Sequence, residues 1–395
     1  IKGKISDGLL KALDVKSDNG KEKEMNPDAY KLYLKAHYLQ KSESPIESIK
    51  LCKDALRIDD NLIEAEHLLA MIYIKTSEYQ KWQEICDRIL LKIEKNSHIY
   101  GSILQMKAFF YTGKRKFNQA LEHSKNAQNI FQEIGDKKAL VRCLGHQGWI
   151  YANRGEWNKA SDYHNEALKI CKELEDPFVM MQTLLDIGFV ELFRNWEIDK
   201  ASDCFNRAYQ IAQDLDSAYG IGMSLMCIGS LLTNQGNFKK AEDYLTRSIT
   251  FFEKIEDKLH MSLAKQTLAE FFYFSGRYKE ALSLFDETSE IQEKIGYTLF
   301  KWGLVACNAS TRKKLGLDID YDSVKKAMEE TSECRELECI DNYFKYIIFE
   351  DKEDIQKAYD DVHRILDSLD EDAKNKALNT ISYKLIMKEW RKINN

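Results

Sequence analysis

The sequence predicts an all-α protein built as a solenoid of helical hairpins. Three observations support this prediction: a recurring unit of about 40 residues, prolines confined to predicted helix starts, and no β-strand pattern in the chain. The repeat is plain in GEWNKASDYHNEAL (155–168), GNFKKAEDYLTRSI (236–249) and GRYKEALSLFDETS (276–289). Such an array buries its core between neighbouring units, so the 395 residues need not divide into compact domains.

The prolines predict where three helices begin. Each follows a residue type that caps helix N-termini: Asn26-Pro27, Ser44-Pro45 and Asp176-Pro177. Proline is tolerated at the first helical position because its missing N–H has no intrahelical partner there.

The repeat itself predicts two antiparallel helices per unit. An aromatic or apolar residue opens each second helix at spacings of 40, 41, 40 and 40: Phe117, Trp157, Ile198, Phe238 and Tyr278. A small residue follows three positions later, and each first helix carries another small-residue column: Ala108, Gly148, Gly188, Gly229 and Ala269. Glycine inside a helix costs about 1 kcal/mol relative to alanine, so three glycines in one column indicate a tight steric site.

These features predict five segments along the chain. Residues 1–25 read as a short amphipathic helix and linker left from an upstream domain, and 26–97 as two degenerate units. Residues 98–297 hold five regular units, 298–369 two further degenerate units, and 370–395 a single capping helix. The chain starts at Ile1 without methionine, so we expect it to be a piece of a longer protein.

The repeat resembles the tetratricopeptide repeat, in which a first-helix Gly and Tyr (Gly148, Tyr151) precede Gly-x-aromatic-x-x-Ala (Gly155, Trp157, Ala160). The longer period is similar to that of kinesin light chains and bacterial peptide-pheromone receptors. This resemblance implies a right-handed α-solenoid. The first 75 residues or so resemble the junction of multidomain bacterial signalling proteins. There an adenylate or guanylate cyclase, a Ser/Thr kinase or a winged-helix regulator precedes the repeats.

Composition excludes several classes of partner. The formal charge is −6 with Lys and Glu interspersed, which argues against nucleic acid. No apolar run is long enough to span a membrane, and no signal peptide is evident. Nine scattered cysteines are typical of reduced thiols in a cytoplasmic protein.

No catalytic, cofactor or metal site is expected. The glycines fall at helix crossings and turns, and no metalloprotease, phosphate-loop or nucleophile-elbow motif occurs. His146 and His164 lie in the clearest unit, but a zinc site needs three or four ligands, so we interpret them as two imidazoles on the helix surface. We therefore expect no enzyme activity.

The first helices offer a candidate binding surface. In the tetratricopeptide fold, positions 2, 5, 9 and 12 of each first helix line the concave face, and amides one position further round could bind a peptide backbone. This frame selects Gln105, Phe109, Arg142, Trp149, Asn153, Gln182, Leu185, Phe189, Met223, Met226, Asn234, Lys265 and Tyr273. Exposed aromatics and methionines in a concavity are typical of partner recognition. The alternative is that a tight superhelix buries Trp149 and Phe189 between first helices.

Three functions remain open from the sequence. The first is a non-catalytic sensing module that binds a protein or peptide segment and regulates an attached or associated effector. The second is a stand-alone receptor for a signalling peptide inside the cell, and the third is the regulatory part of a cyclase or kinase whose catalytic domain lies elsewhere. The chaperone-tail clamp of some tetratricopeptide proteins is disfavoured, because Gly145 and Trp149 replace its Lys and Asn. Terminal units could also pair two copies into a homodimer.

Overall fold

The computed structural model describes residues 26–41, 45–193, 197–331 and 338–394, which form helices joined by turns, with no strand in these ranges. The helix and linker predicted for residues 1–25 and the cap predicted at Ser44 lie outside them. The helices are α2 (Pro27–Lys41), α3 (Pro45–Ile58), α4 (Ile63–Lys75), α5 (Tyr79–Leu90), α6 (His98–Gly113), α7 (Phe117–Ile134), α8 (Lys137–Asn153), α9 (Trp157–Leu174), α10 (Pro177–Phe193), α11 (Ile198–Asp214), α12 (Ala218–Asn234), α13 (Phe238–Lys254), α14 (Lys258–Phe274), α15 (Tyr278–Ile295), α16 (Lys301–Lys314), α17 (Tyr321–Thr331), α18 (Glu338–Phe349), α19 (Lys352–Asp367), α20 (Glu371–Leu378) and α21 (Ile381–Asn394).

The prolines begin helices as predicted. Helices α2, α3 and α10 start at Pro27, Pro45 and Pro177. The Asn26 side-chain oxygen accepts a hydrogen bond from the Asp28 amide at 3.0 Å, and the Asp176 carboxylate accepts one from the Val179 amide at 3.1 Å. Both bonds satisfy first-turn amides that have no intrahelical partner.

The predicted tight contact within each hairpin is confirmed. A Cβ added to Gly188 would lie 2.5 Å from the Phe205 ring, and one added to Gly229 would lie 2.6 Å from the Leu245 side chain. The column therefore admits a large side chain from the second helix, which fills the space above each glycine. Close packing of this kind holds α10 to α11 and α12 to α13.

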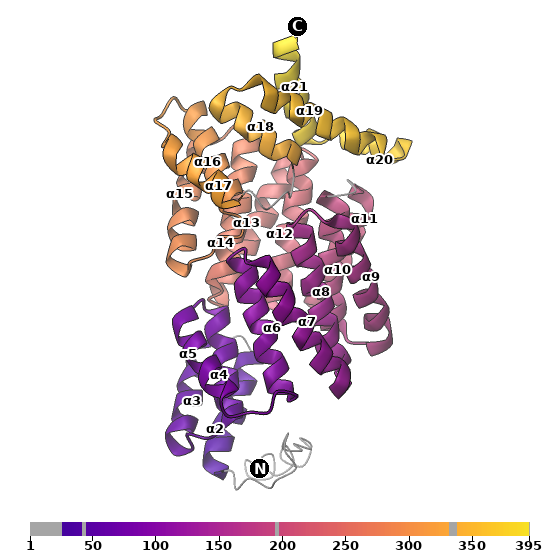
Figure 1. Cartoon of the computed structure of the whole chain (residues 1–395). Coiled ribbons are helices and arrows are strands. Elements are labelled where there is room, and N and C mark those ends of the chain that lie inside the picture. Colours follow the sequence, from indigo (N-terminus) through magenta and orange to yellow (C-terminus); the bar gives the residue numbers. More distant parts are fainter. Residues whose placement is uncertain (1–25, 42–44, 194–196, 332–337, 395) are drawn as a thin grey trace.

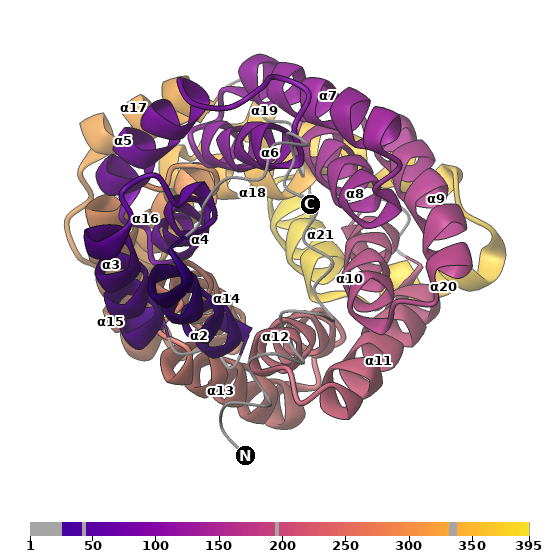
Figure 2. The same cartoon turned by 90° about the horizontal axis from the view of Figure 1, so that it is seen from below.

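The hairpins wind around a common axis (Figure 1). In the end-on view of Figure 2, α6, α8, α10, α12 and α14 form an inner ring, while α7, α9, α11, α13 and α15 form an outer one. After one turn, α16 and α17 pass behind α4 and α5 in that view. Further along, α18 and α19 lie behind α6 and α7, and α20 reaches α11, so the array is a coil that continues well beyond one full turn.

Successive turns of the coil touch at a contact that we call the seam. It joins the α6–α7 turn (residues 113–116) to the segment before α16 (residues 296–300). The Thr298 amide donates to the Gly113 carbonyl at 3.0 Å, and the Arg115 guanidinium donates to the Leu299 carbonyl at 2.8 Å. These partners are up to 185 residues apart, between four and five 40-residue units.

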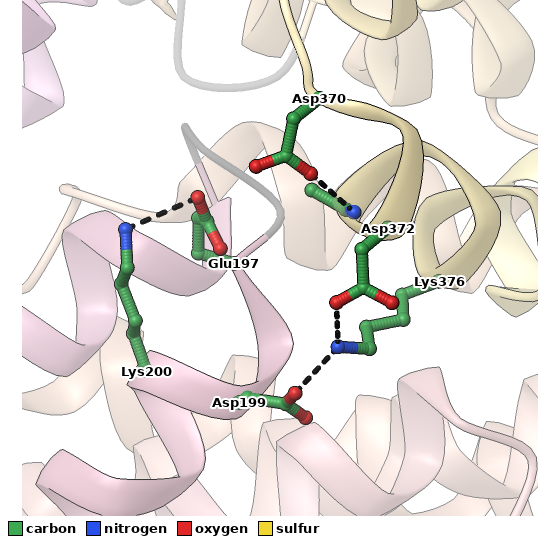
Figure 3. A network of polar contacts seen from close by, with 7 residues as sticks. Glu197, Asp199, Lys200, Asp370, Asp372 and Lys376 are labelled. Atoms are coloured by element: carbon green, nitrogen blue, oxygen red, sulfur yellow. Dashed lines mark hydrogen bonds and ion pairs between the residues drawn. The ribbon is translucent and has the colours of Figure 1, made fainter.

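The C-terminal end differs from the single capping helix that was predicted. It consists of two helices, α20 and α21, because the helix stops at Asn379 and Thr380 caps the next one, accepting from the Tyr383 amide at 3.4 Å. Helix α20 also meets the previous turn of the coil, where Lys376 bridges Asp372 and Asp199 of α11 (Figure 3).

Candidate binding site on the inner face of the ring

An apolar wall lies on the inner helices α8, α10 and α12. Trp149, Phe189, Met223 and Met226 are all partly buried there. The rings of Trp149 and Phe189 pack edge to face with centroids 4.8 Å apart. The two aromatic rings therefore pack on each other while part of each ring stays accessible. The sequence left open whether they are exposed on the concave face or buried between first helices, and the structure lies between these two cases.

Trp149 also contacts the next turn of the coil. Its ring lies edge-on to Phe300 at a centroid distance of 6.2 Å. Because Phe300 belongs to the seam segment, the inner wall and the seam share one hydrophobic cluster. The orientation of Trp149 is therefore set from three sides, by α8, α10 and the segment before α16.

Asp186 is the charged group on this wall. It lies on α10 between Leu185 and Ile187, and its Oδ2 would be 3.0 Å from a Cβ on Gly145, so the glycine makes room for the carboxylate. Within the described chain Asp186 has neither a hydrogen bond nor an ion pair. Desolvation accordingly raises its pKa to about 7.

Asp186 was missed in the sequence analysis, although a signal was present. Helix α10 is otherwise strongly apolar, and its only charged residues are Asp186 and Glu191. A carboxylate in the middle of such an apolar helix deserved a functional interpretation, because removing a charge from water without a partner is costly.

A second acid, Glu270, lies on α14. It accepts a hydrogen bond from the Gln266 amide at 3.1 Å, and burial still raises its pKa to about 7. Two carboxyl groups whose pKa values are raised by burial thus lie on the inner helices α10 and α14.

The amides predicted to bind a peptide are engaged within the protein. Gln105 bonds His146 Nδ1 at 3.1 Å, and Thr112 bonds the other ring nitrogen at 3.0 Å. Asn153 is buried and donates to the Trp149 carbonyl at 2.7 Å, while Asn234 donates to the Ser230 carbonyl at 3.3 Å. The Asn153 oxygen is buried and has no hydrogen-bond partner among the residues that the structure describes.

Of the other residues predicted for the binding surface, some are at least partly accessible to solvent and some are buried. Phe109 is 41% exposed, Arg142 is exposed, Gln182 is partly buried, and Lys265 pairs with Glu287 of α15 at 2.5 Å. Leu185 and Tyr273 are buried at 6% and 4%, so packing rather than a ligand occupies them in this conformation.

The interpretation of His146 and His164 as helix-surface side chains is wrong for His164, which is 2% exposed. His164 lies on the outer helix α9 and packs against Gly148 of α8, and burial lowers the pKa of its imidazole to about 4. Among the residues that the structure describes, no group of three His, Cys, Asp or Glu side chains is arranged to hold a metal ion. None of the described helices is long and apolar enough to cross a bilayer.

Comparison with known proteins supports the fold. The tetratricopeptide-repeat family model matches residues 101–173 and 220–294, which cover most of α6–α9 and α12–α15. The crystal structure of a Rap protein complexed with Competence and Sporulation Factor is similar with a TM-score of 0.56 and 15% identity, covering 93% of this chain and 97% of that one. The fold is therefore a tetratricopeptide-type α-solenoid.

Two characterised proteins are similar in sequence. Response regulator aspartate phosphatase I of Bacillus subtilis (strain 168) is 24% identical over 271 residues, or 65% of this chain and 68% of that protein. The Homo sapiens antiviral innate immune response effector IFIT1 is 33% identical over 96 residues, or 23% of this chain. The match spans only 20% of the human protein's length.

Proposed function

We propose that this protein is a non-catalytic receptor for a short signalling peptide, held against the inner wall formed by α8, α10 and α12. The observation that carries the proposal is the unpaired carboxylate of Asp186 beside the partly exposed rings of Trp149 and Phe189. An apolar wall supplies binding free energy through burial, and a single desolvated charge supplies orientation.

The same geometry suggests the chemistry of the peptide. A cationic group, such as an arginine or lysine side chain, would bring Asp186 the partner that it lacks in the described chain. Large apolar side chains of the peptide would pack on Trp149, Met223 and Met226, since methionine adapts its shape to varied partners. The solved complex of a Rap protein of this fold with Competence and Sporulation Factor supports ligand binding by such a ring.

The test is a selection for ligands, followed by measurement of their affinity. A random linear heptapeptide library is panned on the wild-type chain, and enriched peptides are made with a fluorescent label for anisotropy titration. We expect enriched sequences to pair a basic residue with apolar ones. Trp149→Ala should weaken binding at least roughly tenfold, the scale of a contact worth about 1.4 kcal/mol.

The matched control is Ile134→Ala, which removes an exposed apolar side chain at the end of the outer helix α7. It should leave affinity unchanged. Failure to enrich any peptide, or equal affinity of the Trp149→Ala variant, would remove the basis of the proposal.

Binding would then regulate an effector, either in the same polypeptide or associated with it. Neighbouring units contact each other mainly pairwise, so a ligand that bridges three inner helices can change the curvature of the array. The name of the Bacillus subtilis relative, a response regulator aspartate phosphatase, also suggests phosphatase activity as a second candidate function. Incubation with an aspartyl-phosphorylated receiver domain checks this, and we expect phosphate loss at the spontaneous rate.

A further inference from the structure

The last helix, α21, exposes charges of a single sign, which we call the basic strip: Lys384, Lys388, Arg391 and Lys392. The one acid of this helix, Glu389, is 8% exposed and pairs with Lys392 at 2.8 Å. The side chains of the other three cations have neither a hydrogen bond nor an ion pair among the described residues. A chain with a net charge of −6 thus carries a positive surface at one end.

The basic strip differs from the charged faces of the outer helices. There, cations pair with an acid one turn away, as Arg207 does with Asp203 at 3.2 Å on α11. On α21 the residues one turn apart are Lys384 and Lys388, and then Lys388 and Arg391. Like charges at this spacing destabilise a helix, so the strip is not an ordinary solvated face of mixed sign.

The helix dipole explains only part of the strip. Cations in the last turn of a helix are stabilised by the negative end of the dipole, which accounts for Arg391 and Lys392. It does not account for Lys388 in the middle of α21, and it opposes Lys384 near the N-terminal end. An anion bound along the strip would offset this repulsion.

The strip borders an open groove of about 540 Å³. Its lining residues all belong to α21 and comprise the four cations with Tyr383 and Met387. The other side of the helix packs against α18 and α19, where Trp390 and Ile393 join the core. Figure 1 places α21 at the end of the coil farthest from α2. The groove therefore combines unpaired cations with apolar surface at an accessible end of the molecule.

We propose that the basic strip binds a short acidic segment of a partner protein. Cations on successive turns of α21 lie about 6 Å apart along the helix, and alternate side chains of an extended chain are about 6.6 Å apart. Carboxylates at alternate positions can therefore each meet a cation, while an apolar side chain of the segment packs beside Tyr383 and Met387. The strip shares no residue with the inner wall, so this inference goes beyond the peptide-receptor function and does not depend on it.

The surroundings of the strip favour a short segment over a long polyanion. The strip spans about 12 Å along the helix axis. Helices α19 and α20, which pack against α21, expose carboxylates of their own: Asp360, Asp367, Glu371 and Asp372. A nucleic acid or an anionic bilayer would extend past the strip and meet these like charges, whereas a short acidic segment ends within it.

The test uses the labelled octapeptide EDFEDLED, in which either side of an extended chain presents three carboxylates and one apolar side chain. We expect binding in a fluorescence anisotropy titration, and weaker binding as NaCl rises from about 50 to about 200 mM, because salt screens exposed charges. The amide analogue QNFQNLQN should not bind.

The variant reverses two charges of the strip, Lys384→Glu with Lys388→Glu. It should weaken binding of the acidic peptide at least roughly tenfold, since attraction becomes repulsion. The matched control is Lys239→Glu with Lys240→Glu, which makes the same change of net charge at two exposed lysines of α13 and should leave affinity within about twofold. If charge reversal unfolds α21 by circular dichroism, Lys384→Gln with Lys388→Gln replaces it and should weaken binding at least about threefold.

Four outcomes would overturn the proposal. Two are failure of the acidic peptide to bind, and an equal loss of affinity in the variant and its control. A third is binding of phosphatidylserine vesicles or oligo(dT) that the Lys384 and Lys388 variant loses, because the strip would then recognise polyanions in general. The fourth is self-association of the wild type in sedimentation experiments that the same variant loses, which would assign the strip to a second copy of this chain.

Discussion

His164 occupies a position that later units fill with large apolar side chains. Phe205, Leu245 and Phe285 lie at the corresponding place in the repeat and are buried. His164 is also buried, at 2% exposure, and neither ring nitrogen has a hydrogen-bond partner in the described part of the chain. The imidazole thus fills the space above Gly148 while leaving a polar group unsatisfied, which destabilises the fold.

We predict that His164→Leu stabilises the protein by about 1–2 kcal/mol near neutral pH, the cost of one unsatisfied buried polar group. Leucine suits the site because Leu245 fills the same space above Gly229. The urea midpoint measures the effect, and a lower midpoint would mean that the imidazole has a partner worth more than the apolar contact.

The gain should grow in acid. Burial lowers the His164 pKa from 6.5 to about 4, so the unfolded chain takes up the proton first as pH falls. The wild-type contribution is therefore complete above pH 6.5 and is lost between pH 6.5 and 4. Over this range the midpoint difference between His164→Leu and wild type should widen, and a constant difference would contradict the assignment.

Asp186 produces the opposite pH dependence. Its pKa is raised from 3.8 to about 7, so stability is greatest below pH 3.8 and declines as pH rises towards 7. We predict that Asp186→Asn raises the free energy of unfolding by about 2 kcal/mol at pH 8 and leaves it unchanged at pH 3.8. The value at pH 8 is roughly half of what the whole pKa shift would give, because the side chain is partly solvated. Urea midpoints at the two pH values test this, with Asp162→Asn on the exposed face of α9 as the control.

At the scale of helices, the glycine column decides how closely each hairpin packs. The added methyl of Gly188→Ala would lie 2.5 Å from the Phe205 ring, so one helix must shift. We predict a loss of about 2–3 kcal/mol, typical of overpacking. Gly303→Ala on α16 is the matched control, since its nearest neighbour lies 3.8 Å away, and it should be neutral or stabilising by up to about 1 kcal/mol. Equal effects of the two changes would show that the column is not a steric site.

Most elements were predictable because their signals are local. Prolines and N-caps fix helix starts, and the aromatic at the start of each second helix fixes the hairpin, so residues 98–297 read clearly from the sequence alone. The break in the last helix was missed because Thr380 caps α21 within a polar stretch that also suits a continuous helix. The placement of side chains on the inner face was harder: the frame selected Trp149 and Phe189 but also Leu185 and Tyr273, which tight packing buries.

At the scale of the whole molecule, closure of the coil could not be predicted from the repeat. A period of 40 residues defines each hairpin, but the pitch of the coil follows from small rotations between units. In the sequence, Tyr297 and Leu299 appear only as part of a short apolar stretch after Gly296. Nothing in that stretch indicates that it packs against residues just after position 113.

Closure predicts cooperative unfolding. Repeat arrays that contact only their neighbours can unfold in stages, whereas the seam couples α6–α8 to α14–α16. We predict one calorimetric transition for the span from α6 to α16 in wild type. A triple variant that removes seam contacts (Lys114→Ala, Arg115→Ala, Leu299→Ala) should show two. Two transitions already in wild type would show that the seam contributes little to stability.

Arg115 and Leu299 also set an order of events during synthesis. A ribosome adds about 5–20 residues per second, so the segment before α16 is synthesised roughly ten to forty seconds after the α6–α7 turn that it contacts. Throughout that interval Phe117 and Leu121 lack the cover that Tyr297 and Leu299 later provide. The nascent chain thus passes through a stage with an open apolar edge, which is the stage at which we expect a chaperone to be needed.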